Sequence, residues 1–177
     1  MSSAIVSPSE DEMFDALWGF ISGLFDPSLA AQFIKGYQNL TSTPLGTYCV
    51  ISPGVLVRLN QGQRSYDASG SLLNVQRNSD YYYQVDCYGP QGPDWANIIS
   101  AAWNSLYSTI VLADAPITPL YADEPQQLNI VNGELQYEQR YMTKLHLQTN
   151  QIVGLPQLFF TEVDPSVYPP ADLPPSG

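Results

Sequence analysis

Only a few side chains of this sequence are of types that carry out chemistry. There is one histidine, His146, and there are two cysteines, Cys49 and Cys87, with no CxxC motif and no Cys/His ligand spacing. A Ser-His-Asp or Cys-His arrangement would have to use His146, which lies within a strand-like run among charged neighbours. We therefore expect no catalytic residue, no metal site and no cofactor, and we expect both cysteines to be buried free thiols.

Carboxylates are the remaining candidates for chemistry. Asp123-Glu124 and the pair Glu134 and Glu138 each bring two acids close in sequence, and glycoside hydrolysis needs only two acids. Such pairs are also common on acidic surfaces, and this chain carries 17 Asp and Glu against 6 Lys and Arg, a net charge of −11. That balance argues against a protein that grips nucleic acid, because phosphate binding needs clustered cations. It is compatible with a protein that stays close to DNA without adhering to it.

The first element that would position these residues is a helix near the N-terminus. Apolar residues at helical spacing predict a helix up to about Phe25, with a capping box at either Ser7 to Glu10 or Ser9 to Glu12. Asp26-Pro27 is expected to end it and to start a second helix that runs on to Tyr37. Two interpretations remain open. Both helices form part of the core, or Phe14 or Trp18 packs on a neighbouring subunit.

Strands are predicted for most of the remaining chain. The run 80–88 alternates buried and polar aromatic residues, and Pro93 starts a helix whose apolar stripe reaches Leu106. Residues 61–79 are interpreted as a polar stretch with turn residues. The segment 122–133 is expected to be an extended loop or a hairpin, and 155–163 an edge strand or a short helix. The other predicted strands are 47–52, 54–60, 117–121 and 134–149.

The strand predicted over 134–149 has the most regular pattern in the chain. Leucines and tyrosines alternate there with charged and amide residues, among them Glu134, Glu138, Arg140 and Lys144. Arg140 and Lys144 are the only Lys or Arg from Asp86 to the C-terminus. The charges are either cross-strand pairs on a solvated sheet face or one side of a contact with an identical subunit. A contact of the second kind is head-to-tail and can close into a ring.

Together these elements predict an α+β fold with a small mixed, mainly antiparallel sheet packed with helices. We expect one domain over residues 1–163, with N-terminal helices in 1–38, and a proline-rich extended arm over 164–177. The N-terminus lacks the features of a signal peptide, and no apolar run is long enough to span a membrane. The sequence therefore predicts a soluble protein that does not associate with membranes.

Several stretches resemble the tail (neck) terminator proteins of tailed bacteriophages and prophages. The most specific are QVDCYG (84–89) running into a helix, LYAD (120–123) leading through NGELQYEQR (132–140), and LPQ (155–157). The likeness covers roughly residues 40–163 and depends on the order and spacing of these pieces. It excludes the N-terminal helix and the proline-rich tail.

The resemblance implies a structural virion protein with a small α/β sandwich fold, and not an enzyme. Such a protein would form a hexameric ring on the tail tube, stop polymerisation of the tube and present a surface to head-completion proteins of the neck. Sheath protein would be a further partner if the tail is contractile. The protein would be assembled in the host bacterial cytoplasm and located in the virion. Genome DNA would pass through the ring without specific binding, since an acidic lumen repels it.

On this interpretation the candidate site residues are subunit contacts. Glu134, Glu138, Arg140 and Lys144 would pair between neighbours, Glu124 would lie in a loop that reaches the tube or a protomer, and Tyr168 would lie on the C-terminal arm. Three alternatives remain open. They are another neck component, such as a head–tail stopper or completion protein, a monomeric ligand-binding module with a tyrosine-rich pocket, and the acid-pair hydrolase.

Overall fold

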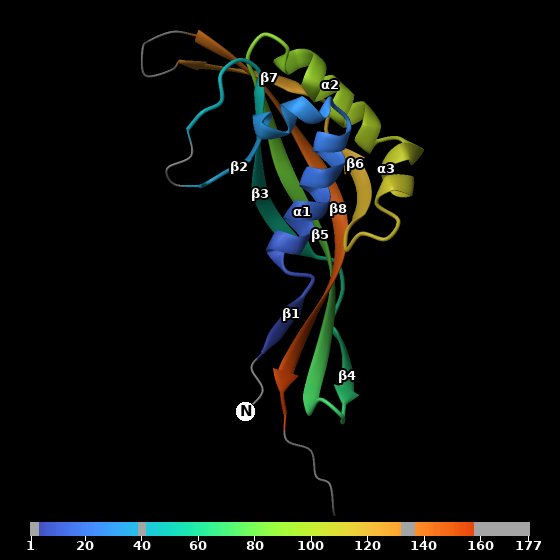
Figure 1. Ribbon diagram of the computed structural model, residues 1–177. Helices are drawn as coiled ribbons and strands as arrows, with labels where there is room; N and C mark the ends of the chain where they lie inside the picture. Colours follow the sequence, from blue (N-terminus) through green and yellow to red (C-terminus); the bar gives the residue numbers. More distant parts are fainter. Residues whose placement is uncertain (1–3, 39–41, 132–136, 158–177) are drawn as a thin grey trace, which may run out of the picture.

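The computed structural model describes residues 4–38, 42–131 and 137–157. They form an α+β fold in which one mixed, mainly antiparallel sheet carries its helices on one face (Figure 1), as the sequence predicts. The helical elements are α1 (Glu10–Gly23), the 3-10 helix η1 (Pro27–Gln32), α2 (Gly92–Trp103) and α3 (Leu106–Val111). The strands are β1 (Ile5–Ser7), β2 (Phe33–Lys35), β3 (Tyr48–Arg58), β4 (Gln63–Asp67), β5 (Leu72–Tyr88), β6 (Thr118–Ala122), β7 (Gln126–Val131) and β8 (Tyr137–Pro156).

Two long strands form the spine of the sheet. β5 and β8 pair antiparallel without interruption, from Leu72 opposite Pro156 to Tyr88 opposite Arg140. β3 and β4 pair with the outer side of β5, whereas β1, β6 and β7 pair with the outer side of β8. β2 lies at one edge and runs parallel to β3, which makes the sheet mixed.

The molecule has a body and a projecting arm (Figure 1). In the body, helices cover one face of the sheet. We define the arm as residues 5–7, 58–79 and 150–156, which contain β1, β4, the first half of β5 and the end of β8. Between the two parts β5 and β8 cross, because β8 lies to the right of β5 in the body and to its left in the arm. The sheet face that carries the helices in the body therefore points to the opposite side of the molecule in the arm.

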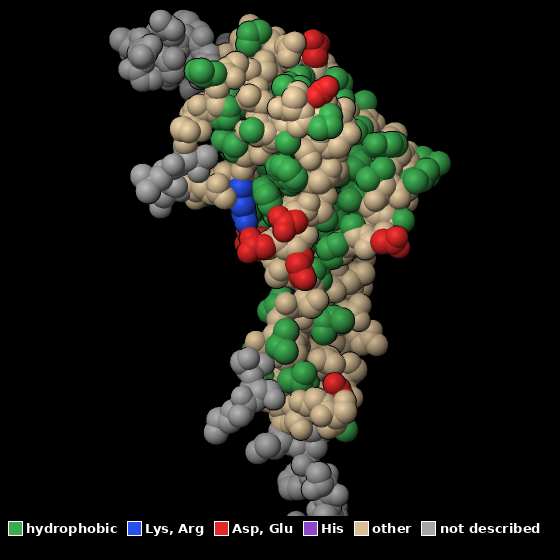
Figure 2. Space-filling model, viewed as in Figure 1, with side chains coloured by type: hydrophobic (Ala, Val, Ile, Leu, Met, Phe, Trp, Pro, Cys, Tyr) green, Lys and Arg blue, Asp and Glu red, His purple; other side chains and the backbone are tan. Residues whose placement is uncertain are grey.

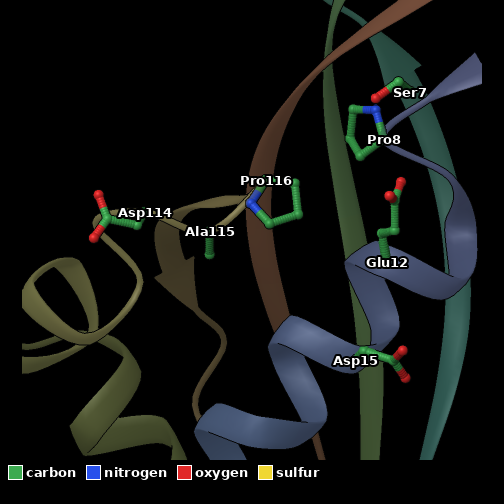
Figure 3. Close-up of a pocket in the computed structure, with 7 residues that line it drawn as sticks. All are labelled: Ser7, Pro8, Glu12, Asp15, Asp114, Ala115 and Pro116. Carbon is green, nitrogen blue, oxygen red and sulfur yellow. The ribbon is translucent and has the colours of Figure 1, made fainter.

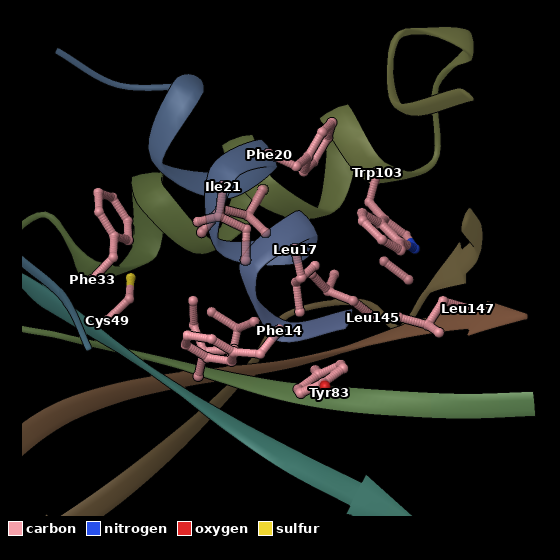
Figure 4. Packing of buried hydrophobic residues seen from close by; sticks show 14 of the residues in the cluster. Phe14, Leu17, Phe20, Ile21, Phe33, Cys49, Tyr83, Trp103, Leu145 and Leu147 are labelled. Carbon is pink, nitrogen blue, oxygen red and sulfur yellow. The ribbon is translucent and has the colours of Figure 1, made fainter. Parts of the chain in front are cut away.

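The core lies between the helices and the body of the sheet (Figure 4). Phe14, Leu17 and Ile21 of α1 pack against the inward side chains of β5 and β8, which include Tyr83 and Leu145. α1 begins with the second of the two predicted capping boxes. Ser9 accepts a hydrogen bond from the backbone of Glu12, whose side chain in turn accepts one from the Ser9 backbone.

The two aromatic residues proposed as neighbour contacts lie within the subunit. Phe14 is buried, and the indole Nε1–H of Trp18 donates a hydrogen bond to the carbonyl of Phe33 at 2.9 Å. The indole of Trp103 in α2 donates in the same way to the carbonyl of His146 at 3.0 Å. These bonds fix α1 and α2 on the sheet, so the interpretation of α1 as a core helix is correct.

One prediction of local structure was wrong, and one element was not predicted. The expected second helix stops at Gln32, because the next three residues pair with β3 as strand β2. In the polar stretch 61–79, for which only turn residues were noted, β4 and the first half of β5 form a hairpin. The hairpin turns at Asp67, whose carboxylate accepts hydrogen bonds from the Ser69 hydroxyl and from the backbone of Gly70 and Ser69. These hydrogen bonds lower the pKa of Asp67. The segment 122–133 does contain a hairpin strand, β7.

Across the described ranges, no helix combines the length and apolar composition that crossing a bilayer requires.

Candidate interaction surfaces

The face of the body's sheet that carries no described helix is lined by aromatic and charged side chains. They come from alternate positions on β3, β5 and β8, because neighbouring residues of a strand point to opposite faces. The rings of Tyr48 and Tyr88 stack there, with centroids 4.8 Å apart. Lys144 and Arg140 of the predicted charged strand lie on this open face, with Lys144 Nζ 5.2 Å from the centre of the Tyr82 ring.

Arg140 has a partner within its own chain. Its Nε and Nη2 donate hydrogen bonds to the two carboxylate oxygens of Asp86, each at 2.9 Å. The Asp86 side chain is only 5% exposed. The hydrogen bonds to Asp86 raise the pKa of Arg140, so Arg140 keeps its positive charge at neutral pH. For Arg140 this geometry supports the first of the two interpretations of the charged strand, a cross-strand pair within one subunit.

His146 lies at the centre of a second polar group on the same face. Its ring stacks on Tyr121 with centroids 4.2 Å apart. Asp80 Oδ1 is 3.5 Å from Nδ1, and Asp123 Oδ1 is 3.8 Å from Nε2. The described contacts of the His146 ring are therefore with two carboxylates and with the rings of Tyr121 and Tyr82.

The structure separates the other predicted site residues. Glu124 is exposed in the short connection between β6 and β7. Glu138 lies on β8 opposite Ile130, and its side chain is outside the described part. Glu134 and Tyr168 also lie outside the described residues. Of the predicted set, only Arg140 and Lys144 are brought together on one described surface.

Cys49 and Cys87 are opposite each other on β3 and β5, and both are free and buried. Their sulfur atoms are 2.7 Å apart. Burial raises the pKa of the Cys49 thiol far above its ordinary value, so it stays protonated at physiological pH. The expectation of buried free thiols is confirmed.

An open cleft lies where the arm joins the body (Figure 3). One wall comes from the start of α1 and the other from the turn after α3. Asp15 and Asp114 are exposed on opposite walls, and Glu12 lies between Asp15 and the cis peptide at Pro8. The cleft is lined by Ser7, Pro8, Glu12, Asp15, Asp114, Ala115 and Pro116. Sequence reasoning missed this cleft, because its acids are about 100 residues apart along the chain.

A family model described as phage neck terminator protein matches residues 11–169 of the chain. The chain belongs to this family. No curated protein matches it. Membership places the chain among structural components of the phage neck.

Two surfaces of this neck-terminator family member expose apolar side chains that ordinarily would be covered. The first is α3, where Leu106 is 73% and Ile110 is 65% exposed, and the second is the arm. In Figure 2 hydrophobic side chains gather over α2 and α3. Patches of this kind mark interaction sites. The predicted apolar helical stripe ended at Leu106, so the sequence did not indicate this surface, although 106–111 contains further apolar residues.

Proposed function

We propose that this chain is a tail terminator that assembles into a ring, most simply a hexamer, on the last ring of the tail tube. The ring caps the tube, stops its polymerisation and joins it to the head-completion proteins of the neck. Sheath protein is a further partner if the tail is contractile. The observation that carries the proposal is the match to the neck terminator family over residues 11–169.

The mechanism is geometric and involves no catalysis. One face of the ring matches the end of the tube, and the other face offers incoming tube subunits no docking site. Exposed apolar residues on α3 and on the arm support assembly, because a monomer that stayed alone would leave both surfaces in water. The net charge of −11 per copy supports passage of DNA through the ring without adhesion.

The charged residues predicted as subunit contacts have a secondary role in this proposal. Lys144 and Glu124 remain available for contacts with a neighbour or with the tube, whereas Arg140 already binds Asp86. Glu134, Glu138 and Tyr168 keep their proposed roles as subunit contacts. Lys144 and Glu124 are therefore the members of the set to substitute first.

The test is oligomeric state in the presence of the tube. The purified chain is measured by light scattering and by negative-stain electron microscopy, alone and mixed with tube protein of the same phage. We expect rings, at least in the mixture, and tubes that no longer elongate once rings are bound. A chain that stays monomeric in both samples, or tubes that elongate at their normal rate, would contradict the proposal and favour another neck component or a monomeric binding module.

A further inference from the structure

The arm concentrates the unpaired cations of the chain. Of the six Lys and Arg, three lie there: Arg58, Arg64 and Arg77. Arg64 is opposite Val75, which is two residues from Arg77, and Arg58 is opposite Ser79, which is two residues further along β5. The three arginines therefore share one face of the arm. All three are exposed, and none forms an ion pair or a side-chain hydrogen bond with any described residue.

Of the other three cations, two form ion pairs within the chain and the third contacts an aromatic ring. Lys35 binds Asp11 at 2.7 Å, Arg140 binds Asp86, and Lys144 lies over the ring of Tyr82. In a chain that carries 17 acids, a cluster of unpaired arginines on one projecting element is a marked segregation of charge. No described residue supplies the acids that would complement these arginines, and a second molecule is the source that we consider for them.

The face of the arm that carries the three arginines also exposes apolar side chains. One row across the strands runs Val6, Val153, Val75 and Arg64, and the next runs Leu155, Leu73 and Tyr66. The continuation of this face in the body is the buried core face, which includes Tyr81 and Tyr83, but no described helix covers it in the arm. Val6 is 48% and Tyr66 is 64% exposed. Apolar side chains interspersed with arginine are typical of a protein–protein interface.

A surface with complementary character lies on the body of the same chain. α3 exposes Leu106, Ile110 and Val111, and the turn that follows it carries Asp114, which lies on the wall of the acidic cleft opposite to that of Asp15 (Figure 3). Neither Asp15 nor Asp114 forms an ion pair with a described residue. This surface therefore offers apolar area beside unpaired carboxylates.

We propose that the arginine face of the arm of one subunit packs against the α3 surface and the acidic cleft of the next copy of this chain. The proposal rests on the ring-forming function proposed above and specifies its subunit contact. An arm cannot reach its own α3 surface in this way, because it projects beyond the helices and turns this face to the opposite side of the molecule (Figure 1). A contact between two different surfaces of identical subunits is heterologous, and such contacts close into rings.

Charge reversal on each side tests the contact. The arm variant carries Arg64→Glu and Arg77→Glu, and the cleft variant carries Asp15→Lys and Asp114→Lys. Each variant alone should require at least a tenfold higher concentration than wild type to form rings with tube protein, as measured by native mass spectrometry. An equimolar mixture should recover rings in which the two variants alternate, because each reversed arm then meets a reversed cleft. A single chain with all four substitutions should also recover.

A control variant distinguishes loss of this contact from a general effect of added positive charge. Asp94→Lys adds the same charge as Asp114→Lys at an exposed position of α2 outside both surfaces, and should leave ring formation unchanged. If reversal disturbs folding, as judged by circular dichroism, the neutral variants R64Q/R77Q and D15N/D114N replace it and should show a smaller loss in the same direction.

The outcomes are distinct. The contact is overturned if wild type forms rings and the variants are unimpaired, or if the variants fail both alone and when mixed. In either case the proposal that the chain forms a ring still stands. A wild-type chain that forms no ring with the tube would overturn both proposals. Arm variants that form normal rings but lose affinity for a short DNA duplex would assign the arginines to nucleic acid and overturn the contact.

Discussion

Arg140 shows how much a single partner changes the interpretation of a charged side chain. In the sequence it is an isolated cation on an alternating strand, and a pairing with another subunit is as reasonable as a pairing within the chain. The structure opposes Arg140 to Tyr88 on β5 and brings Asp86 within reach of both guanidinium nitrogens. Sequence periodicity gives the face on which a residue lies, but it does not give the strand that pairs next to it.

Breaking this pair should destabilise the monomer. Arg140→Met leaves the carboxylate of Asp86 buried with Gln84 as its remaining side-chain partner, which costs about 3 kcal/mol of unfolding free energy. Lys144→Met is the matched control on the same strand and face, and it should cost less than about 1 kcal/mol because it removes only a contact with a ring face. Equal losses in urea unfolding for the two variants would contradict the importance of the Asp86 pair.

Two buried tyrosines should make the fold sensitive to alkaline pH. Burial raises the pKa of Tyr81 and of Tyr83 above the ordinary value of 10.0. Above about pH 10 the unfolded chain loses these protons while the folded chain retains them, so stability is complete below that pH and falls as pH rises. Unfolding free energy measured from pH 8 to 11 should decline, and Tyr83→Phe should make the decline shallower. An unchanged slope in this variant would contradict the assignment.

At the scale of elements, agreement between prediction and structure depends on whether one face is buried. α1, α2 and the strand through Tyr81 and Tyr83 bury a single face, so apolar periodicity identifies them. The hairpin of β4 and β5 is exposed on both faces, so its sequence resembles a loop. Phe33 illustrates another limit: its local sequence favours a helix, but pairing with Cys49 on β3 places it in a strand.

Close packing at an irregularity of β3 gives a test at this scale. The register of β3 shifts between Pro53 and Leu56, and the ring of Tyr82 covers Gly54, so that an added Cβ would overlap the ring. Gly54→Ala should therefore destabilise the fold by about 1–3 kcal/mol. Gly19→Ala in α1 has open space and should stabilise it by about 0.5–1 kcal/mol. Thermal unfolding of both variants measures the signs, and a stabilising Gly54→Ala would refute this packing.

At the scale of the whole molecule, the sequence predicted the fold class and the family, whereas the arrangement of surfaces needed the structure. The acidic cleft joins residues near the N-terminus with residues 114–116, and the three arginines of the arm come from three separate strand segments. Pairing of β3 and β4 with β5 brings the arginines together, and the crossing of β5 and β8 turns the arm's face away from the helices. The predicted residues Glu134 and Tyr168 lie outside the described part, so their roles stay predictions.

The central claim is that this member of the neck terminator family ends tube growth. The most direct measurement is the distribution of tail lengths, by electron microscopy, in a phage from which the gene is deleted. We predict tails that are overlong or that lack heads, with normal length and joining restored when the protein is supplied in trans. Tails of normal length joined to heads in the deletion would contradict the account.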